Sequence, residues 1–544
     1  MALLDSWWRG RFWFTCAAGG AANGTSISRL SIEWPGRPAT PGCIIGSREG
    51  AILRAIVLAL LCVAGCQQPA SAQSASERKI PRTWDEGELE SWTIPAREPS
   101  AYTVHVPSSF YYNIPVAPIY KSYPIYHPEK EPPGYIEWLQ KQEPQIVFDA
   151  SKLHTDREWV AAGKLVFEDP RGSVPVGIFR DASWYQQVKI PLTSDGIVPG
   201  WRYVVRKRGI LEAGSASCSA CHSRVMPDGS LLNGPQTNYP AERDAAWDIP
   251  SQRNLQDARK YTSGLFGLVF SPGYKSFLVN ETAELDVDQI AGIREAIPPG
   301  AVLRVGVSVS TPVKIADLVG VRDRRYLDLI ARVQHRNIGD MMRYAAFDPG
   351  DVVFFSDRKT LPTEMPLRAS GLSRFSDEQL FALALYIYSL QPPPNPNRPD
   401  KLAKRGQKVF EREGCAGCHT PPLYTNNKLT LAGDFEPPAE HRSRYDILPV
   451  RVGTDPRSAM QAMRGTGYYK VPSLKGVWYR GPFEHNASVA TLEDWFDARR
   501  LRDDYVPTGF KGYGVKTRAV RGHEFGLKLS GEDKRALMSF LRTL

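Results

Sequence analysis

Two short motifs in this sequence bring two thiols and an imidazole together. Residues 218–222 read CSACH and residues 415–419 read CAGCH. This spacing places both thiols on one turn, where each can add to a vinyl group of a porphyrin, while the histidine can bind the iron. The motifs therefore predict two covalently attached c-type haems. The predicted thioether residues are Cys218, Cys221, Cys415 and Cys418, and the predicted iron ligands are His222 and His419.

Other chemistries of paired cysteines fit these motifs less well. A zinc site also uses cysteine pairs, but it does not need a histidine directly after each pair. A thioredoxin-like redox pair belongs in a βαβ context, which the sequence does not show. Once the leader described below is removed, Cys66 is the one cysteine outside the motifs, so we expect no disulfide.

The segments that lead into the motifs resemble each other. Residues 404–419 (KRGQKVFEREGCAGCH) predict an amphipathic helix that runs directly into the second motif, and this helix resembles the first helix of a class I cytochrome c. Residues 161–168 (AAGKLVFE) repeat the helix pattern well before the first motif. An insertion at about 168–217, with strand-like runs and turn residues, accounts for the longer gap and predicts a small β structure.

Two further pairs of segments repeat in the same order. Residues 314–321 match 470–477 at an offset of 156, and residues 376–390 match 530–544 at an offset of 154. Each copy of the last segment begins with a serine that can cap a helix. Three repeated segments in the same order, the last two at nearly constant offset, indicate a tandem duplication.

We therefore expect a mainly α-helical protein with two tandem class I cytochrome c-like domains, the first with the β insertion. Residues 100–135 are dense in Pro and Tyr, which favours an irregular N-terminal extension that wraps over the first haem domain. The predicted parts are a leader (1–65), a tether and Pro/Tyr-rich extension (66–151), haem domain 1 (152–390), a Pro-rich linker (391–400) and haem domain 2 (401–544).

Residues 470–496, KVPSLKGVWYRGPFEHNASVATLEDWF, follow the second motif and resemble the bacterial di-haem cytochrome c peroxidase superfamily. This superfamily also contains the di-haem protein of methylamine dehydrogenase maturation and the di-haem rubber oxygenase. The resemblance covers 401–544 closely and 152–390 more loosely. It implies that the haem at 415–419 transfers electrons and that the haem at 218–222 is the reactive one.

The second axial ligand of each iron decides its chemistry, because an iron with two strong ligands only moves electrons and an open position can bind peroxide or oxygen. His523, just before the last helix, is the predicted ligand of the second haem. Met460 and Met463 are alternatives, since peroxidases of this family often use methionine there. For the first haem, Met365 in LPTEMP is the candidate ligand; the alternative is that it only packs against the porphyrin.

Five further residues have weaker assignments. His335 is a candidate reversible ligand or a helix-capping residue, and His485 is expected to bond a propionate or to orient a ligand. Trp247 and Trp478 could carry electrons between the haems, although tryptophan is more often a core residue. Glu281 is a candidate general acid for cleavage of an O–O bond, with a plain loop carboxylate as the alternative.

An apolar run at 55–64 (AIVLALLCVA) follows Arg54, which is typical of a secretory signal and too short for a spanning helix. It ends in Val-Ala-Gly-Cys66, which resembles the bacterial lipoprotein box. We therefore expect a periplasmic protein that is anchored to the membrane through a lipid on Cys66. An ordinary signal peptide cut near Ala72 is the alternative.

The composition is that of a folded protein. Of the 544 residues, 42% are hydrophobic and 23% are charged, which excludes wholesale disorder. No window has about 18 uninterrupted apolar residues, so a polytopic membrane protein is excluded. The net charge of +10 falls when the leader is removed, and we expect no nucleic-acid partner.

Together these features predict an exported di-haem cytochrome that transfers electrons and reduces peroxide at the first haem. A small cytochrome or cupredoxin is the expected redox partner, and peroxide or oxygen the expected substrate. A non-enzymatic di-haem electron carrier and a haem-dependent oxygenase are the alternatives.

Overall fold

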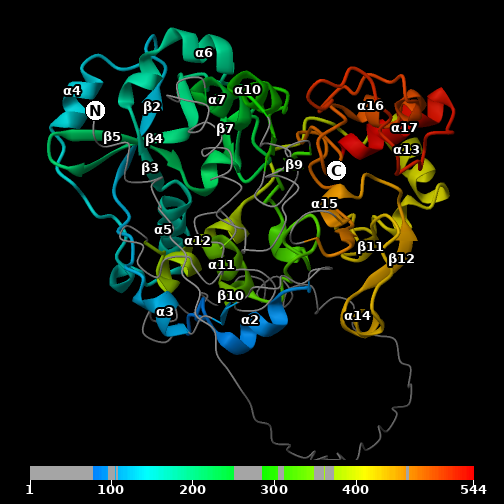
Figure 1. Cartoon of the computed structure of the whole chain (residues 1–544), viewed down its shortest axis with the longest axis horizontal. Helices are drawn as coiled ribbons and strands as arrows, with labels where there is room; N and C mark the ends of the chain where they lie inside the picture. The colour runs from blue at the N-terminus through cyan, green and yellow to red at the C-terminus, as the bar shows by residue number, and fades with distance from the viewer. Residues whose placement is uncertain are drawn as a thin grey trace, which may run out of the picture.

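The computed structural model describes residues 78–95, 104–105, 108–249, 285–303, 311–347, 360–361, 373–460 and 465–544. Two lobes lie side by side (Figure 1), one built from the chain up to α12 and the other from α13 onwards. The predictions for Cys66, Glu281, Met365 and Met463 lie outside the described residues.

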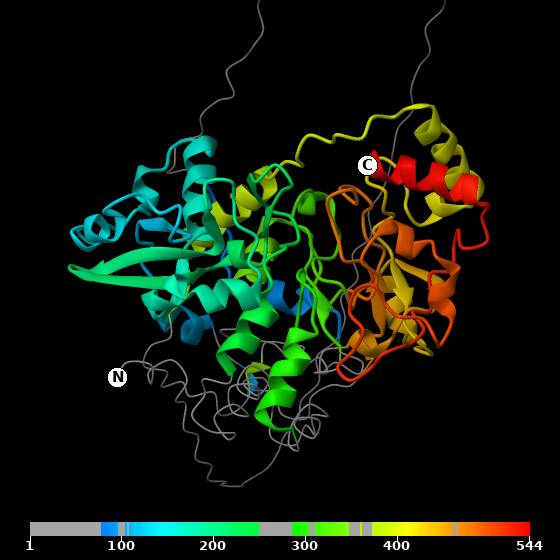
Figure 2. The same ribbon diagram turned by 90° about the horizontal axis from the view of Figure 1, so that it is seen from above.

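One pair of crossed helices forms the centre of each lobe. In the first lobe α5 (Asp156–Phe167) packs on α12 (Asp377–Ser389). In the second lobe α13 (Lys401–Arg412) packs on α17 (Gly531–Arg542). The extended residues 391–400 connect the two pairs and run between the lobes (Figure 2).

The two crossings match in detail. A methyl group built on Gly163 would lie 1.9 Å from the carbonyl oxygen of Ala382, and one built on Gly406 would lie 1.9 Å from that of Ala536. These distances are far inside van der Waals contact, so each helix pair can approach this closely only at a residue without a side chain. The repeated pattern Gly-x-x-Val-Phe-Glu therefore marks the same contact in both lobes.

Aromatic pairs beside the two glycines repeat as well. Phe167 and Tyr386 lie edge to face with ring centroids 5.2 Å apart, and Phe410 and Phe540 do the same at 5.4 Å. The interplanar angles are 63° and 61°. Such edge-to-face pairs stabilise a core beyond the area that they bury.

The predicted serine caps of α12 and α17 are confirmed. The Ser376 hydroxyl accepts a hydrogen bond from the Gln379 backbone N–H, and the Ser530 hydroxyl accepts one from the Asp533 N–H, each at 3.1 Å. Both caps satisfy a backbone donor that has no partner within the helix. They fix where each helix begins, and hence where the preceding loop must end.

A four-stranded antiparallel sheet covers one end of the first lobe. Its order is β2 (Ser122–Tyr126), β4 (Ile197–Lys207), β5 (Ile210–Ala216) and β3 (Pro170–Val174). Strands β3, β4 and β5 come from the segment in which the sequence predicts a β insertion. The edge strand β2 comes from the Pro/Tyr-rich extension.

That extension is more regular than the sequence predicts. An irregular course is expected from its proline content, but Pro124 lies within β2. Proline is tolerated on an edge strand because one side of that strand has no neighbour to receive its N–H.

The prediction of a mainly α-helical protein is also wrong in its proportions, because the structure is mixed, with 36% helix and 15% strand.

The remaining elements are shorter. The other α-helices are α2 (Glu86–Trp92), α3 (Ser108–Asn113), α4 (Tyr135–Gln140), α6 (Ala182–Val188), α7 (Ala241–Asp248), α10 (Val287–Glu295), α11 (Ile338–Phe347), α14 (Ala439–Arg444), α15 (Arg457–Met460) and α16 (Leu492–Trp495). The other strands are β1 (Val104–His105), β6 (Ser223–Val225), β7 (Leu231–Asn233), β8 (Ala301–Val302), β9 (Val313–Lys314), β10 (Thr360–Leu361), β11 (Leu429–Leu431), β12 (Ile447–Arg451) and β13 (Tyr468–Lys470). In the second lobe β12, β11 and β13 form a three-stranded sheet.

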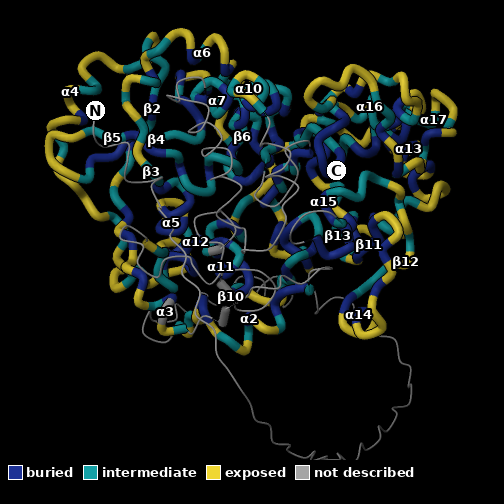
Figure 3. The backbone as a smooth tube through the Cα atoms, viewed as in Figure 1, coloured by how far each residue is buried: buried dark blue, intermediate teal, exposed yellow. Residues whose placement is uncertain are grey.

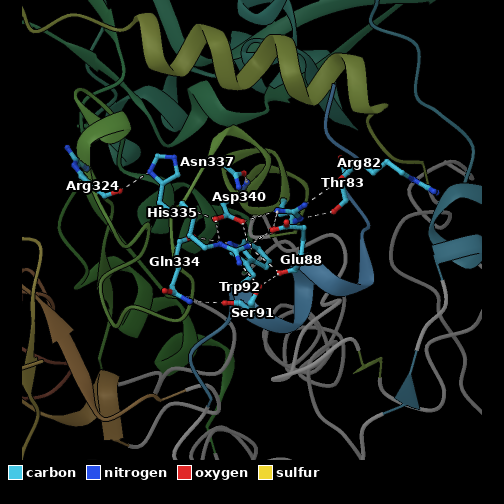
Figure 4. A network of polar contacts seen from close by, with 12 residues as sticks. Arg82, Thr83, Glu88, Ser91, Trp92, Arg324, Gln334, His335, Asn337 and Asp340 are labelled. Atoms are coloured by element: carbon cyan, nitrogen blue, oxygen red, sulfur yellow. Dashed lines mark hydrogen bonds and ion pairs between the residues drawn. The ribbon is translucent and has the colours of Figure 1, made fainter. Parts of the chain in front are cut away.

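A buried ion-pair network fastens the start of the described chain to α11 (Figure 4). The Asp340 carboxylate is fully buried and accepts hydrogen bonds from Arg336 Nε at 2.8 Å and from Arg343 Nη1 at 2.9 Å. Arg336 also donates to Glu88 of α2 at 2.9 Å, and Arg343 donates to the Thr83 carbonyl at 3.1 Å. The network joins α2 to the core of the first lobe.

Burial is high along α11 and α12 and low in outer elements such as α4, α6 and α14 (Figure 3), while α13 and α17 bury only the faces that they turn to each other and to the core. The largest cluster of buried apolar residues surrounds α5, α11 and α12, and a smaller one surrounds α13 and α17. Within the described residues no helix is long and apolar enough to cross a membrane.

We predict that Gly406→Ala destabilises the second lobe by about 1–3 kcal/mol, because the new methyl group would overlap the Ala536 carbonyl and push the two helices apart. Denaturant unfolding of the purified protein measures this change. Gly177→Ala is the matched control, since a methyl group there would meet no atom within 4 Å. Equal stability of the two variants would contradict the assigned contact.

Candidate haem site

The two CxxCH motifs fold into the same turn. A short 3-10 helix covers residues Cys218–Ala220 in the first motif and Cys415–Gly417 in the second. In each motif the histidine N–H donates to the carbonyl of the first cysteine at 2.9 Å, and the second cysteine N–H donates to the same carbonyl at 3.3 Å. Each turn thus holds both thiols and the imidazole on adjacent positions.

The thiols have the properties of buried, neutral side chains. All four cysteines of the motifs are partly buried, and neither pair forms a disulfide. Burial raises the pKa of Cys218 to about 11 and that of Cys415 to about 11. A redox-active CxxC pair instead has a lowered thiol pKa. Within the described residues no group of three His, Cys, Asp or Glu side chains is arranged to hold a bare metal ion.

The ring orientation of His419 is fixed by two carbonyl groups. Its Nδ1 lies 3.2 Å from the Tyr424 oxygen and 3.1 Å from the Pro472 oxygen. Because a carbonyl can only accept, Nδ1 carries the proton and Nε2 keeps its lone pair. Burial lowers the pKa of His419, which favours the neutral ring that a metal requires.

His523 faces His419 across the site. The two ring centroids are 6.3 Å apart, with 53° between the ring planes. Two metal–imidazole bonds of about 2 Å each, plus about 1 Å from each nitrogen to its ring centre, add up to about 6 Å. An iron with two axial imidazoles therefore fits between the rings. Burial lowers the pKa of His523 to about 4, so this ring is neutral as well.

The loop that carries His523 has a fixed conformation. His523 has φ 46° and the preceding Gly522 has φ 86°, so both lie in the left-handed region. A methyl group on Gly522 would lie 2.2 Å from the Thr454 nitrogen. The His523 N–H donates to the Val452 carbonyl at 2.6 Å, and its ring packs edge to face on Trp495 at 5.0 Å. These contacts hold the imidazole towards His419.

Arg500 clamps the same loop from behind. Only 1% of Arg500 is exposed, and its guanidinium donates to three carbonyl groups. The acceptors are Trp495 at 3.0 Å, Val520 at 2.6 Å and His523 at 2.9 Å. No sequence pattern predicts this residue, because nothing in the motif spacing marks an arginine whose hydrogen bonds all go to backbone carbonyls.

The structure favours His523 over Met460 as the candidate ligand of the second haem. The Met460 side chain packs against the apolar clusters around Leu429 and Tyr469 rather than facing His419. His523 is thus the one of the two that the fold brings to the second motif. The third candidate, Met463, lies outside the described residues.

His335 and His485 have polar partners of their own. The His335 ring nitrogens lie 2.8 Å from the Arg324 carbonyl and 2.5 Å from the Tyr388 hydroxyl. His485 Nε2 lies 2.6 Å from the Asp455 carbonyl, and its ring stacks on Tyr469 at 4.3 Å. Both rings are therefore engaged with protein atoms in this structure.

The two tryptophans have different surroundings. Trp247 packs against the apolar cluster beneath the four-stranded sheet, which favours a core role. Trp478 lies edge to face with Tyr479 at 5.1 Å in the second lobe. No described contact joins either tryptophan to a motif residue.

The first motif is placed by the inserted sheet. Strand β5 ends at Ala216, two residues before Cys218, and β4 crosses the turn so closely that a methyl group on Gly200 would lie 3.1 Å from the Ala220 Cα. The carbonyl of His222 accepts a hydrogen bond from Gly234 at 2.7 Å. The insertion therefore positions the motif, a role that the spacing alone did not reveal.

Comparisons with known proteins agree with a haem site. No family model matches the chain. Two cytochrome c peroxidases of Denitromonas iodatirespirans resemble parts of it. IdrP1 is 30% identical over 112 residues, which are 17% of this chain and 29% of that protein. IdrP2 is 27% identical over 157 residues, which are 26% of this chain and 39% of that protein. The chain therefore matches much less than two thirds of either relative.

Two solved structures also share limited similarity. Hydrazine synthase of Kuenenia stuttgartiensis has 17% identity and a TM-score of 0.27, over 52% of this chain and 92% of that one. A MauG-like protein associated with microbial copper homeostasis has 15% identity and a TM-score of 0.21, over 35% and 62%. The distant similarity to the peroxidases supports haem as the cofactor and a peroxidase-like redox function.

We predict that Arg500→Gln lowers the free energy of unfolding by at least about 2 kcal/mol, because it leaves buried carbonyl groups without donors. Thermal unfolding followed by circular dichroism measures the loss. Arg502→Gln is the control two residues along, since Arg502 is 67% exposed and pairs with the exposed Asp504. A similar loss in both variants would rule out the clamp.

Proposed function

We propose that the chain is an exported c-type cytochrome with two covalently bound haems, each in a cytochrome c-like lobe, and that it transfers electrons and reduces peroxide. The facing pair His419 and His523, with ring centroids 6.3 Å apart, is the observation that carries this proposal. A bound haem would supply one-electron chemistry at its iron. Cys218, Cys221, Cys415 and Cys418 would hold the two porphyrins through thioether bonds.

The second lobe is the proposed electron-transfer side. His419 and His523 would occupy both axial positions there, which leaves no position for a substrate. The Tyr424 and Pro472 carbonyls orient His419, and Arg500 holds the loop of His523. This rigid arrangement suits electron transfer, because neither ligand has to move when the charge on the iron changes.

The first lobe is the proposed reactive side. His222 would be its iron ligand, and Met365 the ligand on the opposite side that must leave before peroxide can bind. Glu281 is the proposed proton donor for the O–O bond. Met365 and Glu281 rest on the sequence alone.

A second function has one specific observation in its favour. The facing pair His419 and His523 would close the second site to substrates, and an equally closed first lobe would make the protein an electron carrier without peroxidase activity. For either function we propose a periplasmic location, with a lipid anchor on Cys66. The proposed partner is a small cytochrome or cupredoxin.

We predict that His523→Ala leaves both haems covalently attached but changes the second one, because His523 would supply only a coordinate bond. Loss of one imidazole should raise the reduction potential or produce a high-spin fraction. Optical and electron paramagnetic resonance spectra of the ferric protein measure this. His441→Ala removes another buried imidazole, one that lies against the Tyr468 hydroxyl, and should leave the spectra unchanged. An unchanged low-spin spectrum in His523→Ala would exclude this ligand.

We predict that Met365→Ala makes the oxidised protein reactive towards peroxide, because it removes the ligand that otherwise must leave. The wild type should turn over peroxide only after one haem has been reduced. Steady-state turnover with an artificial donor is measured for oxidised, half-reduced and variant protein. Met460→Ala is the control for loss of a thioether. If all three forms are inert while electron transfer stays fast, the protein is a carrier.

A further inference from the structure

Each sequence repeat carries a lysine and an arginine at matching positions. Lys314 and Arg324 in the first repeat correspond to Lys470 and Arg480 in the second, all at the offset of 156. We call them the basic seam, because they lie where the two lobes meet.

The two arginines of the basic seam have equivalent hydrogen bonds. Arg324 Nη1 donates to the Asp317 carbonyl, and Arg480 Nη2 donates to the Ser473 carbonyl at 2.7 Å. Asp317 and Ser473 are themselves equivalent positions of the repeat. Backbone carbonyls orient both guanidinium groups but supply no full negative charge.

The two lysines connect the first repeat to the second. Lys470 Nζ reaches across to the first lobe and donates to the Tyr326 carbonyl at 3.0 Å and the Leu327 carbonyl at 2.8 Å. Burial, and then Arg324, lower the pKa of Lys470 to about 7, while burial and Arg480 lower the pKa of Lys314 to about 8. Each lysine is thus close to the arginine of the other repeat.

Few acids of the described residues lie in direct contact with the seam, although Glu484 near Lys314 and Asp328 near Lys470 raise the pKa values of these lysines in part. Asp317 is the one carboxylate among the described residues within ion-pair distance of any of the four, at 3.8 Å from Arg480 Nε. That carboxylate also accepts from the Tyr479 hydroxyl at 3.0 Å. The pKa values of both lysines stay lowered despite these acids, so an anion in direct contact with the seam would stabilise the buried cations.

The seam lies beside the second haem motif. Arg480 is bound to the carbonyl of Ser473, and the carbonyl of the preceding residue, Pro472, is the one that orients His419. The same backbone segment therefore holds the proposed iron ligand and a seam cation. The repeat places Arg324 in the equivalent position of the first lobe.

We propose that the basic seam binds the propionate carboxylates of the two haems, with Lys314, Arg324, Lys470 and Arg480 as their counter-charges. This inference rests on the proposed function, because it needs both haems. The ligand chemistry is a carboxylate held by guanidinium and ammonium groups at the boundary between the lobes. A cation beside a haem favours its reduced state, so the seam also raises the reduction potentials.

The test compares wild type with Lys314→Met and Arg480→Gln. Lys314→Met is the cleaner change, because the Lys314 side chain has no hydrogen bond within the described part of the chain. Arg502→Gln is the control, since it removes an exposed arginine. Haem content is measured as pyridine haemochrome, the propionate bending bands by resonance Raman spectroscopy, and the reduction potentials by spectroelectrochemical titration.

We expect all variants to retain two haems. Lys314→Met and Arg480→Gln should shift a propionate band and lower at least one potential, while Arg480→Lys should recover most of the potential and Arg502→Gln should change neither quantity. Unchanged bands and potentials in both seam variants would overturn the propionate site but leave the proposed function intact. A wild type without covalent haem would instead refute the proposed function.

The seam could also bind a free anion. One further measurement distinguishes a free anion from the haem propionates. Phosphate is titrated into wild-type and Lys314→Met holoprotein while the melting temperature is followed. Equal, small responses agree with a seam already filled by propionates. Stabilisation of the wild type alone would mean that the seam takes a free anion, and the propionate assignment would fail.

Discussion

The close crossing of two helices at a glycine is the contact on which the rest of each lobe depends. A methyl group at Gly163 or Gly406 would lie 1.9 Å from a carbonyl oxygen of the partner helix, so the helices touch backbone to backbone. In the second lobe the loops that follow α13 and precede α17 start from this fixed geometry. In the second lobe these loops carry the motif with His419 on one side and His523 on the other, which is why two rings so far apart in sequence can face each other.

Much of this arrangement is predictable from the sequence, because covalent attachment and helix packing both demand fixed spacing. The CxxCH motifs, the glycine of the repeated helix pattern and the serine caps Ser376 and Ser530 all satisfy local rules. His523 is predictable from its place before the last helix. The sheet partner β2 is not, since the prolines on both sides of it and within it indicate irregular extended chain.

The functional residues that the sequence did not predict share a physical property. Arg500 acts only through backbone carbonyls, and the seam residues Arg324 and Arg480 are oriented by backbone carbonyls as well. Such contacts depend on where the chain returns in space, so no spacing in the sequence announces them. The repeat did hold one signal, since residues 314–324 and 470–480 both begin with lysine and end with arginine.

The matched helix pairs also bear on how a duplicated chain can diverge. Gly163 and Ala382 are 219 residues apart (382 − 163), whereas Gly406 and Ala536 are 130 residues apart (536 − 406). Because the entropy of closing a loop grows only with the logarithm of its length, the longer first loop costs about 0.5 kcal/mol more. One copy could therefore acquire the three strands β3, β4 and β5 between its helices almost without thermodynamic consequence, while the other stayed short.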